Sequence, residues 1–231
     1  MTTLSEIREA ADWRDLLEGQ AQHAAFAILM TVGACALLQN SADAPQLLGL
    51  SATGWAKLSI ALAVAHQIIV AVVFRLQLYH NVMTRLFGSH DMRVWAAIFL
   101  PLLVVRPVTM ILTGWADSMP IGPYFPAQFT LGLALVGVAI WGMHSVLVHF
   151  TLPRALGGDH FRDKYLTMPP VTGGVFNYTS NGMYGVVFLG LWGIALMFGS
   201  WNALVLALFQ HAYIWVHMYC TEAPDMRRLY S

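Results

Sequence analysis

Six long apolar segments constrain this chain more than any other feature. They lie at roughly 21–39, 55–75, 94–114, 129–150, 183–199 and 202–220. Most reach the length of about 20 residues that a helix needs to cross the hydrocarbon of a bilayer. The chain is 58% hydrophobic and 10% charged, whereas soluble domains carry about 25% charged residues. We therefore expect an all-α integral membrane protein with about six transmembrane helices, of which the fifth is short enough to be tilted or kinked.

The distribution of Lys and Arg predicts the orientation of these helices. Basic residues precede the first segment and follow the second, fourth and sixth: Arg8, Arg14, Arg75, Arg85, Arg93, Arg154, Arg162, Lys164, Arg227 and Arg228. The connections 40–54, 115–128 and 200–201 contain neither Lys nor Arg. By the positive-inside rule, we expect both termini and the loops 75–93 and 151–182 to be cytoplasmic.

The N-terminal residues 3–18 have the pattern of an amphipathic helix. Thr3 and Glu6 have capping-box spacing, and apolar residues recur near the helical period. Gly19 is a plausible stop. We expect this helix to form an interfacial unit, residues 1–20, that lies along the membrane. The charged start also predicts no cleaved secretory signal.

The last two apolar segments predict a helical hairpin. About four residues at Gly199–Asn202 separate them, so the helices must run antiparallel. This fold-back returns Glu222 to the membrane face that carries Asn181 and Tyr184. We therefore divide the chain after the N-terminal helix into a three-helix membrane region and a catalytic membrane region. Their ranges are 21–128 and 129–231.

The longest hydrophilic stretch is the loop 151–182. Its Gly157-Gly158 pair permits close backbone approach to a ligand, and Asp159 with His160 could bind or move protons. The same composition is typical of an ordinary flexible loop with turn residues. Both interpretations stay open at this point.

Glycines and one arginine interrupt the apolar segments. Gly132, Gly137 and Gly142 favour close helix packing, and Gly137 could alternatively open room for a ligand. Arg106 lies within the third segment, where a charge is expensive. Because it lies nearer the outer end, we expect it to snorkel or to pair with Asp117.

Five histidines lie in the apolar segments: His66, His144, His149, His211 and His217. Paired intramembrane histidines can ligate haem, so a haem-binding electron carrier is an alternative of another class. Cys35 and Cys220 form no disulfide framework or metal-ligand spacing, and we expect no metal site. A formal net charge of zero argues against nucleic acid as a partner.

Several motifs in order resemble the phosphatidylethanolamine N-methyltransferase (phospholipid methyltransferase) family of integral membrane enzymes. The resemblance covers about two-thirds of the chain, without the first two helices. It is carried by Thr84–Ser89, the Gly-rich stretch Leu131–Ala139, Leu156-Gly157-Gly158-Asp159-His160-Phe161, Asn181-Gly182-Met183-Tyr184, and Glu222-Ala223-Pro224 with Tyr230.

The resemblance implies an S-adenosylmethionine-dependent enzyme that methylates a membrane lipid head group. The expected acceptor is the amine of phosphatidylethanolamine or of its methylated forms. The cofactor-binding residues implied are Gly137, Ala139, Asn181, Tyr184 and Glu222. The catalytic residues implied are Glu222, with His160 or Asp159 as a proton relay.

The chain departs from the family pattern at three positions. Ala139 stands where the second glycine of Gly-x-Gly is expected, Gly182 replaces a proline, and Ala223 replaces one of two paired acids. A related alternative is an isoprenylcysteine carboxyl methyltransferase or an enzyme for another small lipophilic acceptor. Its Arg-His-Pro-x-Tyr motif is absent, because residues 180–184 read Ser-Asn-Gly-Met-Tyr. A third alternative is a non-catalytic scaffold that kept the fold.

Overall fold

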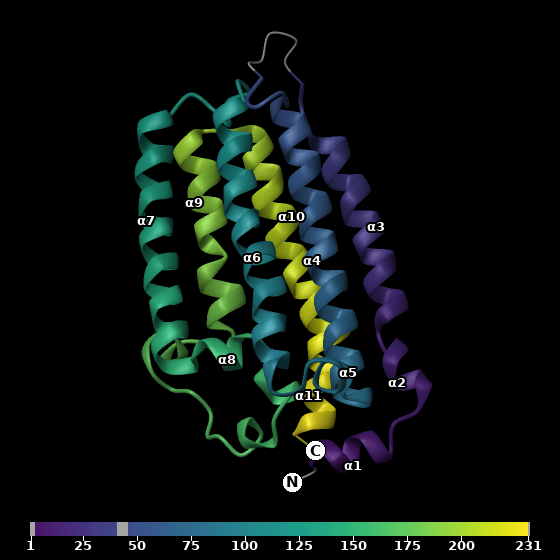
Figure 1. Cartoon of the computed structure of the whole chain (residues 1–231). Coiled ribbons are helices and arrows are strands. Elements are labelled where there is room, and N and C mark those ends of the chain that lie inside the picture. Colours follow the sequence, from purple (N-terminus) through teal and green to yellow (C-terminus); the bar gives the residue numbers. More distant parts are fainter. Residues whose placement is uncertain (1–2, 41–45, 231) are drawn as a thin grey trace.

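A bundle of long helices makes up most of the molecule (Figure 1). The structure, a computed structural model, describes residues 3–40 and 46–230, and within these ranges it contains helices and loops but no extended strand. The α-helices are α1 (Leu4–Glu9), α2 (Trp13–Leu17), α3 (Gln20–Leu37), α4 (Ala52–His80), α5 (Val82–Phe87), α6 (Asp91–Ala116), α7 (Phe125–Ser145), α8 (Leu152–Ala155), α9 (Leu189–Phe198), α10 (Trp201–His217) and α11 (Ala223–Leu229).

Five helical stretches in the described ranges are long and apolar enough to cross a membrane. They are Trp13–Leu37, Ala52–His80, Val82–Ala116, Phe125–Phe150 and Trp201–Leu229. Large apolar side chains are exposed on their outer faces: Ile28, Leu29, Val32, Val104, Val108, Ile111, Leu131, Leu133, Ile140 and Leu208. Contiguous apolar exposure of this kind suits contact with lipid rather than water. The expectation of an all-helical fold is therefore confirmed for the described ranges, with five of the expected six or so segments long and apolar enough to cross a membrane.

The fifth expected segment is shorter than the others. The apolar helix Met183–Phe198 starts with a π-helical turn, Met183–Val187, before α9 begins. It falls below the spanning length, as its sequence indicated. The sixth segment, in contrast, continues past its expected end at residue 220 and remains helical to Leu229.

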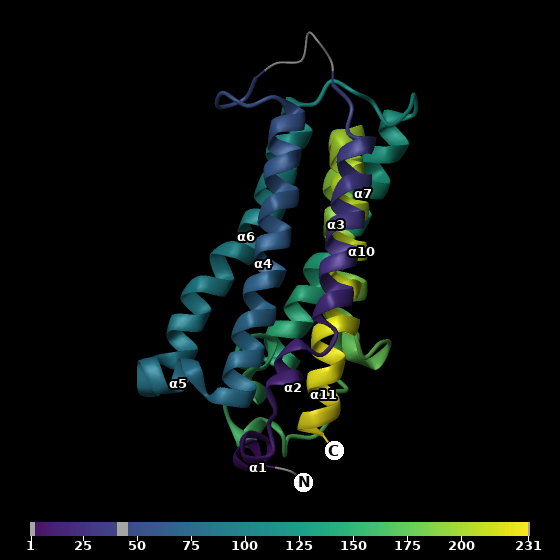
Figure 2. The ribbon, with the colours of Figure 1, turned by 90° about the vertical axis from the view of Figure 1, so that its right-hand side faces the viewer.

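The helices form two layers (Figure 2). α4 and α6 lie in one layer, and α3, α7 and α10 lie in the other. Buried small residues allow the two layers to meet, among them Ala56 and Ala63 of α4 and Ala203 and Ala207 of α10. Both termini, α5, α8 and α11 gather at one end of the bundle (Figure 1). The loops expected to be cytoplasmic thus share an end, while residues 41–45 of the opposite loop 40–54 lie outside the described ranges.

The N-terminal segment is not one helix, and this corrects the expectation for residues 3–18. The Thr3 capping box with Glu6 is present, but α1 ends at Glu9 and the Asp12 side chain caps a second helix, α2. The apolar side of α1 packs on protein: Leu4 and Ile7 are buried with Leu78, Tyr79, Leu166 and Leu229. The α1 helix therefore covers the end of the bundle instead of presenting its apolar face to lipid.

Asp117 ties the opposite end of the bundle together. Its carboxylate accepts hydrogen bonds from Ser200 Oγ at 2.6 Å and from the backbone N–H of Asn202 at 3.0 Å. Gly199 provides the left-handed turn, with φ +60°, that starts this hairpin connection. The expected pairing of Arg106 with Asp117 is wrong, because Asp117 is occupied here and Arg106 bonds elsewhere.

Candidate active site

A cavity of about 540 Å³ lies at the end of the bundle that holds both termini. Side chains from both layers line it, together with the loop 151–182 and the α10–α11 connection. Ligand sites in proteins span roughly 300–1,000 Å³, so this volume suits a small-molecule site. The residues Asp159, His160, Asn181, Tyr184 and Glu222, all predicted from the sequence, line it.

Glu222 is held at the cavity wall by Tyr184 and His217. The Tyr184 hydroxyl donates a hydrogen bond to Glu222 Oε1, and His217 Nε2 lies 3.5 Å from the same oxygen. A π-helical turn, Met218–Glu222, precedes Pro224 at the start of α11. Such turns insert an extra residue and often occur at functional sites. The expected return of Glu222 to Tyr184 by the hairpin is confirmed.

His160 lies between two carboxylates. Its Nδ1 is 3.0 Å from Asp159 Oδ1, its Nε2 is 3.2 Å from Asp225 Oδ2, and its ring stacks on Phe74. Burial disfavours the charged ring, but the hydrogen bonds and charges of the two carboxylates outweigh burial and raise the pKa of His160 to about 10. A charged ring with both nitrogens engaged is poorly suited to the proton-relay role expected from the sequence.

Asp225 connects this histidine to Arg75. Arg75 Nε lies 3.0 Å from Asp225 Oδ1, and both side chains are buried. Arg75 also donates to the backbone carbonyls of Glu18 at 3.0 Å and Thr221 at 3.3 Å. Arg75 was expected in a cytoplasmic loop, and it instead lies inside α4, where it links this helix to α11 and to the segment before α3.

The first part of loop 151–182 is anchored, so it is not an ordinary flexible loop. The Trp95 indole donates to the carbonyl of Leu156 at 2.9 Å. Arg162 forms a two-pronged pair with the buried Asp91, at 2.9 Å and 2.7 Å. Forked pairs of this kind fix geometry as well as charge. The loop therefore presents Asp159 and His160 from a fixed frame.

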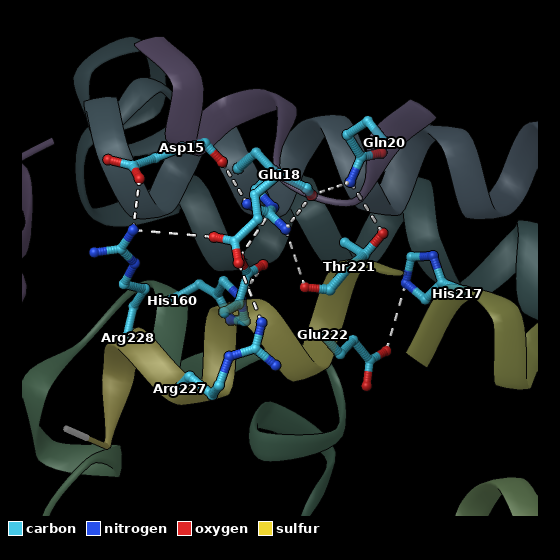
Figure 3. Close-up of polar contacts among 11 residues, drawn as sticks. Asp15, Glu18, Gln20, His160, His217, Thr221, Glu222, Arg227 and Arg228 are labelled. Atoms are coloured by element: carbon cyan, nitrogen blue, oxygen red, sulfur yellow. Dashed lines mark hydrogen bonds and ion pairs between the residues drawn. The ribbon is translucent and has the colours of Figure 1, made fainter. Parts of the chain in front are cut away.

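The segment before α3 is fastened to the helical segment that carries Glu222 (Figure 3). We call these contacts the N-terminal latch: Arg228 with Asp15 at 2.7 Å, Arg227 with Glu18 at 3.1 Å, and Gln20 with Thr221 at 3.3 Å. In Figure 3 the Glu222 side chain points away from the latch toward His217. The latch thus supports the backbone on one side while Glu222 faces the cavity on the other.

Arg106 lies on the cavity wall within α6. It is buried, its Nε donates to Gln210 Oε1 at 2.8 Å, and its guanidinium lies over the Phe188 ring at 5.0 Å. The sequence identified Arg106 as unusual but assigned it the wrong partner. Gln210 has no local sequence signal that pairs it with residue 106.

Gly137 and Ala139 do not line the cavity. Gly137 is exposed on α7, and a Cβ added there would meet no described atom within 4 Å. Ala139 is buried against Gly190 of α9. Gly132 shows the close packing expected of small residues, since an added Cβ would lie 2.7 Å from the Gly193 carbonyl oxygen.

The histidines considered as haem ligands have varied surroundings. His211 Nδ1 accepts a hydrogen bond from the Trp192 indole at 2.9 Å. His217 faces Glu222, and His66 packs edge-on against Phe99 with ring centroids 4.9 Å apart. Three of the five histidines thus have protein neighbours from different helices.

Sequence reasoning missed Arg75, His217 and the structural place of Asp225. A signal existed for Arg75, because Gln67 and Arg75 recur at helical spacing along one side of α4, and both are buried. The partners of Asp225 and His217 come from distant elements, and no local pattern indicates them.

Comparison with known proteins finds a family resemblance in the C-terminal part of the chain. Residues 127–231 match the family model described as phospholipid methyltransferase. Relatives named phosphatidylethanolamine N-methyltransferase match from Malassezia globosa, 29% identical over 59% of this chain, and from Laccaria bicolor, 34% identical over 45%. One from Botryotinia fuckeliana is 25% identical over 67% of this chain.

The matched segments are small parts of much longer proteins. They cover 14% of the Malassezia globosa protein, 11% of the Laccaria bicolor protein and 14% of the Botryotinia fuckeliana protein. No solved structure matches this chain. The match includes the Asp159-His160 loop, Asn181, Tyr184 and Glu222, which the cavity brings together. Over residues 127–231, the chain is therefore similar to the phospholipid methyltransferase family.

Proposed function

We propose that the chain transfers a methyl group from S-adenosylmethionine to the amine of phosphatidylethanolamine or of its methylated forms. The observation that carries the proposal is the Glu222–Tyr184 pair on the wall of the cavity, within the family-matched region. The relatives named phosphatidylethanolamine N-methyltransferase support the choice of acceptor.

The cavity residues fit the cofactor. Its sulfonium is a compact cation, and Glu222 offers a carboxylate beside the aromatic face of Tyr184. When bound, S-adenosylmethionine supplies the methyl group for an in-line displacement. Asn181, which lines the cavity near Tyr184 in the chain, belongs to the same proposed binding set. Gly137 and Ala139 stay outside this set because they do not line the cavity.

Glu222 has two roles in the proposed mechanism. Its negative charge draws the substrate ammonium toward the transfer position, and its carboxylate then takes the amine proton so that the nitrogen lone pair is free. Tyr184, which donates to Oε1, fixes the carboxylate orientation. Holding the two reactants in line and away from water supplies much of the rate enhancement in such a displacement.

Asp159, His160, Asp225 and Arg75 form the frame of the site in this proposal. Each of these charges pairs with one of opposite sign. Asp159 and Asp225 contact the two nitrogens of the His160 ring, and Arg75 contacts Asp225. Burial disfavours the Asp159 carboxylate, but the hydrogen bond and charge of His160 outweigh burial and lower its pKa. We propose that these groups position α11 and the loop and do not carry the transferred proton.

Transfer of label to lipid tests the function. Purified protein in phosphatidylethanolamine vesicles, given methyl-labelled S-adenosylmethionine, should yield labelled methylated phosphatidylethanolamine on lipid chromatography. Phosphatidylglycerol vesicles lack an amine and should stay unlabelled. A protein that binds the cofactor but labels no lipid would overturn the proposal.

We also propose that six segments span the membrane with this cavity at the cytoplasmic side, as the Lys/Arg pattern predicts. Ser118 and Thr167 are exposed and belong to loops at opposite ends of the bundle. Single cysteines at these positions, with Cys35 and Cys220 replaced, should react with an impermeant reagent from opposite sides. Labelling from one side would contradict this topology.

A further inference from the structure

Arg106 has donor capacity that the protein does not use. Its Nε is bonded to Gln210, but its Nη2 is buried and has no hydrogen-bond partner among residues 3–40 and 46–230. The side chain is 3% exposed and lines the cavity. Burying an ionised donor without a partner is costly, and charges within membrane helices usually serve a function.

A second polar group without a partner lies at the same cavity. His66 on the adjacent helix α4 is 2% exposed, and neither ring nitrogen has a hydrogen-bond partner in the described part of the chain. Its ring lines the cavity beside Phe99. A guanidinium from α6 and an imidazole from α4 thus line the same cavity. A ligand with more than one acceptor oxygen can accept from the Arg106 guanidinium and from the N–H of the His66 ring together.

We propose that Arg106 and His66 bind the phosphodiester of the lipid acceptor. This inference rests on the proposed function and names the chemical class of its substrate, a zwitterionic lipid. A guanidinium suits this ligand because its planar fork matches two phosphate oxygens at once.

The arrangement of the aromatic residues supports this assignment. The Arg106 guanidinium lies 5.0 Å from the Phe188 ring, and Phe188 lies 6.3 Å from the Tyr184 ring. Tyr184 in turn bonds Glu222. A fixed positive charge and a fixed negative charge therefore flank one pair of aromatic rings. A head group that carries both a phosphate and an amine is complementary to this order of charges.

The position of Arg106 favours a lipid over a soluble anion. It lies in the interior of α6, fifteen residues after Asp91, or roughly 22 Å along the helix axis. A lipid can enter such a site sideways between helices, whereas a free anion would first lose its water. The arginine precedes the family-matched region. The N-terminal helices would thus supply acceptor recognition to the family's methyl-transfer site.

A matched pair of ligands tests the proposal without relying on catalysis. Dodecylphosphocholine and dodecyltrimethylammonium share a tail and a quaternary nitrogen, but only the first has a phosphodiester. Their binding is measured by thermal stabilisation of the protein in a sugar-head-group detergent, with S-adenosylhomocysteine present. We expect the unmodified protein to bind dodecylphosphocholine about tenfold to a hundredfold more tightly, the range for one charge-assisted contact.

Variants test whether Arg106 causes the preference for dodecylphosphocholine over dodecyltrimethylammonium. Arg106→Gln should abolish this preference, and S-adenosylhomocysteine should still stabilise the variant. Arg93→Gln, an exposed arginine on the same helix, should leave it intact. If Arg106→Gln does not fold, Arg106→Lys keeps the charge without the fork and should lower the preference. An unchanged preference in the variant that folds would overturn the proposal.

Three further outcomes would also overturn the assignment. Equal binding of both ligands by the unmodified protein would show that the site does not recognise the phosphodiester. Loss of S-adenosylhomocysteine stabilisation in Arg106→Gln would assign the guanidinium to the cofactor instead. Tight binding of tail-free glycerophosphocholine would show that the phosphodiester arrives from water. If the protein transferred no methyl group, the proposed function would be wrong. The binding comparison would still show whether Arg106 recognises a phosphodiester.

Discussion

Gly19 lies against the backbone of Cys220, so closely that a Cβ at position 19 would be 2.1 Å from the Cys220 carbonyl oxygen. Gly19 also has φ +78°, which L side chains rarely adopt. Cys220 lies two residues before Glu222. The junction of the N-terminal segment with α3 therefore sets the position of the proposed catalytic carboxylate.

Gly19→Ala should lower both thermal stability and methyl transfer, because the backbone of the α10–α11 connection must move to admit the new methyl group. Gly49→Ala is the matched control. Gly49 has φ +81° but would meet no described atom within 4 Å, so it shares the conformational strain without the clash. Melting temperature and turnover are measured for both variants. Equal effects of the two would mean that strain alone matters and that the contact with Cys220 does not.

Asp225→Asn should destabilise the protein strongly. The change leaves Arg75 and the charged His160 buried without their shared carboxylate, and breaking a buried pair costs about 3–5 kcal/mol. Thermal unfolding in detergent measures the effect. Glu9→Gln, an exposed acid on α1, is the control and should change little. Normal melting of Asp225→Asn would contradict the buried network.

The burial of Asp225 has no local signal in the sequence. Asp225 follows Pro224 in a charged tail, a pattern that is typical of a solvated residue. Its burial depends on Arg75, which is far away in the sequence. Apolar length and the short hairpin turn predicted the helices and the meeting of Glu222 with Tyr184, because those signals are local. The partners of Asp225, Arg106 and Gly19 are set by helix packing, which hydropathy does not encode.

The charged state of His160 gives a pH-dependent contribution to stability. A histidine in the unfolded chain has a pKa near 6.5, and the fold raises the pKa of His160 to about 10. Because the folded pKa is the higher one, the contribution is fully present below pH about 6.5 and is lost as pH rises toward about 10. The melting-temperature advantage of the unmodified protein over His160→Gln should therefore narrow across this window.

His80→Gln is the control for that series, since His80 is exposed at the end of α4. Its melting temperature should follow that of the unmodified protein at each pH. An advantage over His160→Gln that stays constant or widens with rising pH would mean that the ring is not held as a cation.

Substitutions of two glycines in α7 test where the cofactor binds. The two candidate places are the cavity and the Gly-x-Gly position implied by family resemblance. Gly132→Leu should disrupt packing with α9, because an added Cβ would already lie 2.7 Å from the Gly193 carbonyl oxygen. Gly137→Leu should be tolerated, since that position is exposed and open. Thermal stabilisation by S-adenosylhomocysteine is the measurement. A folded Gly137→Leu protein that lost this stabilisation would move the cofactor site to the outer face of α7.

Glu222→Gln isolates the charge proposed to act in catalysis. The amide keeps the size of the side chain and can still accept the Tyr184 hydrogen bond, but it carries no negative charge and accepts no proton. Turnover should fall about 10²-fold to 10³-fold, the magnitude for losing one preorganised electrostatic contact. Folding should survive, because Glu222 is only partly buried and makes none of the contacts of the N-terminal latch. Glu9→Gln again provides the control for a lost carboxylate. The next residue, Ala223, is not an acid that could replace Glu222. Unimpaired methylation by Glu222→Gln would therefore show that the Glu222 carboxylate takes no part in catalysis.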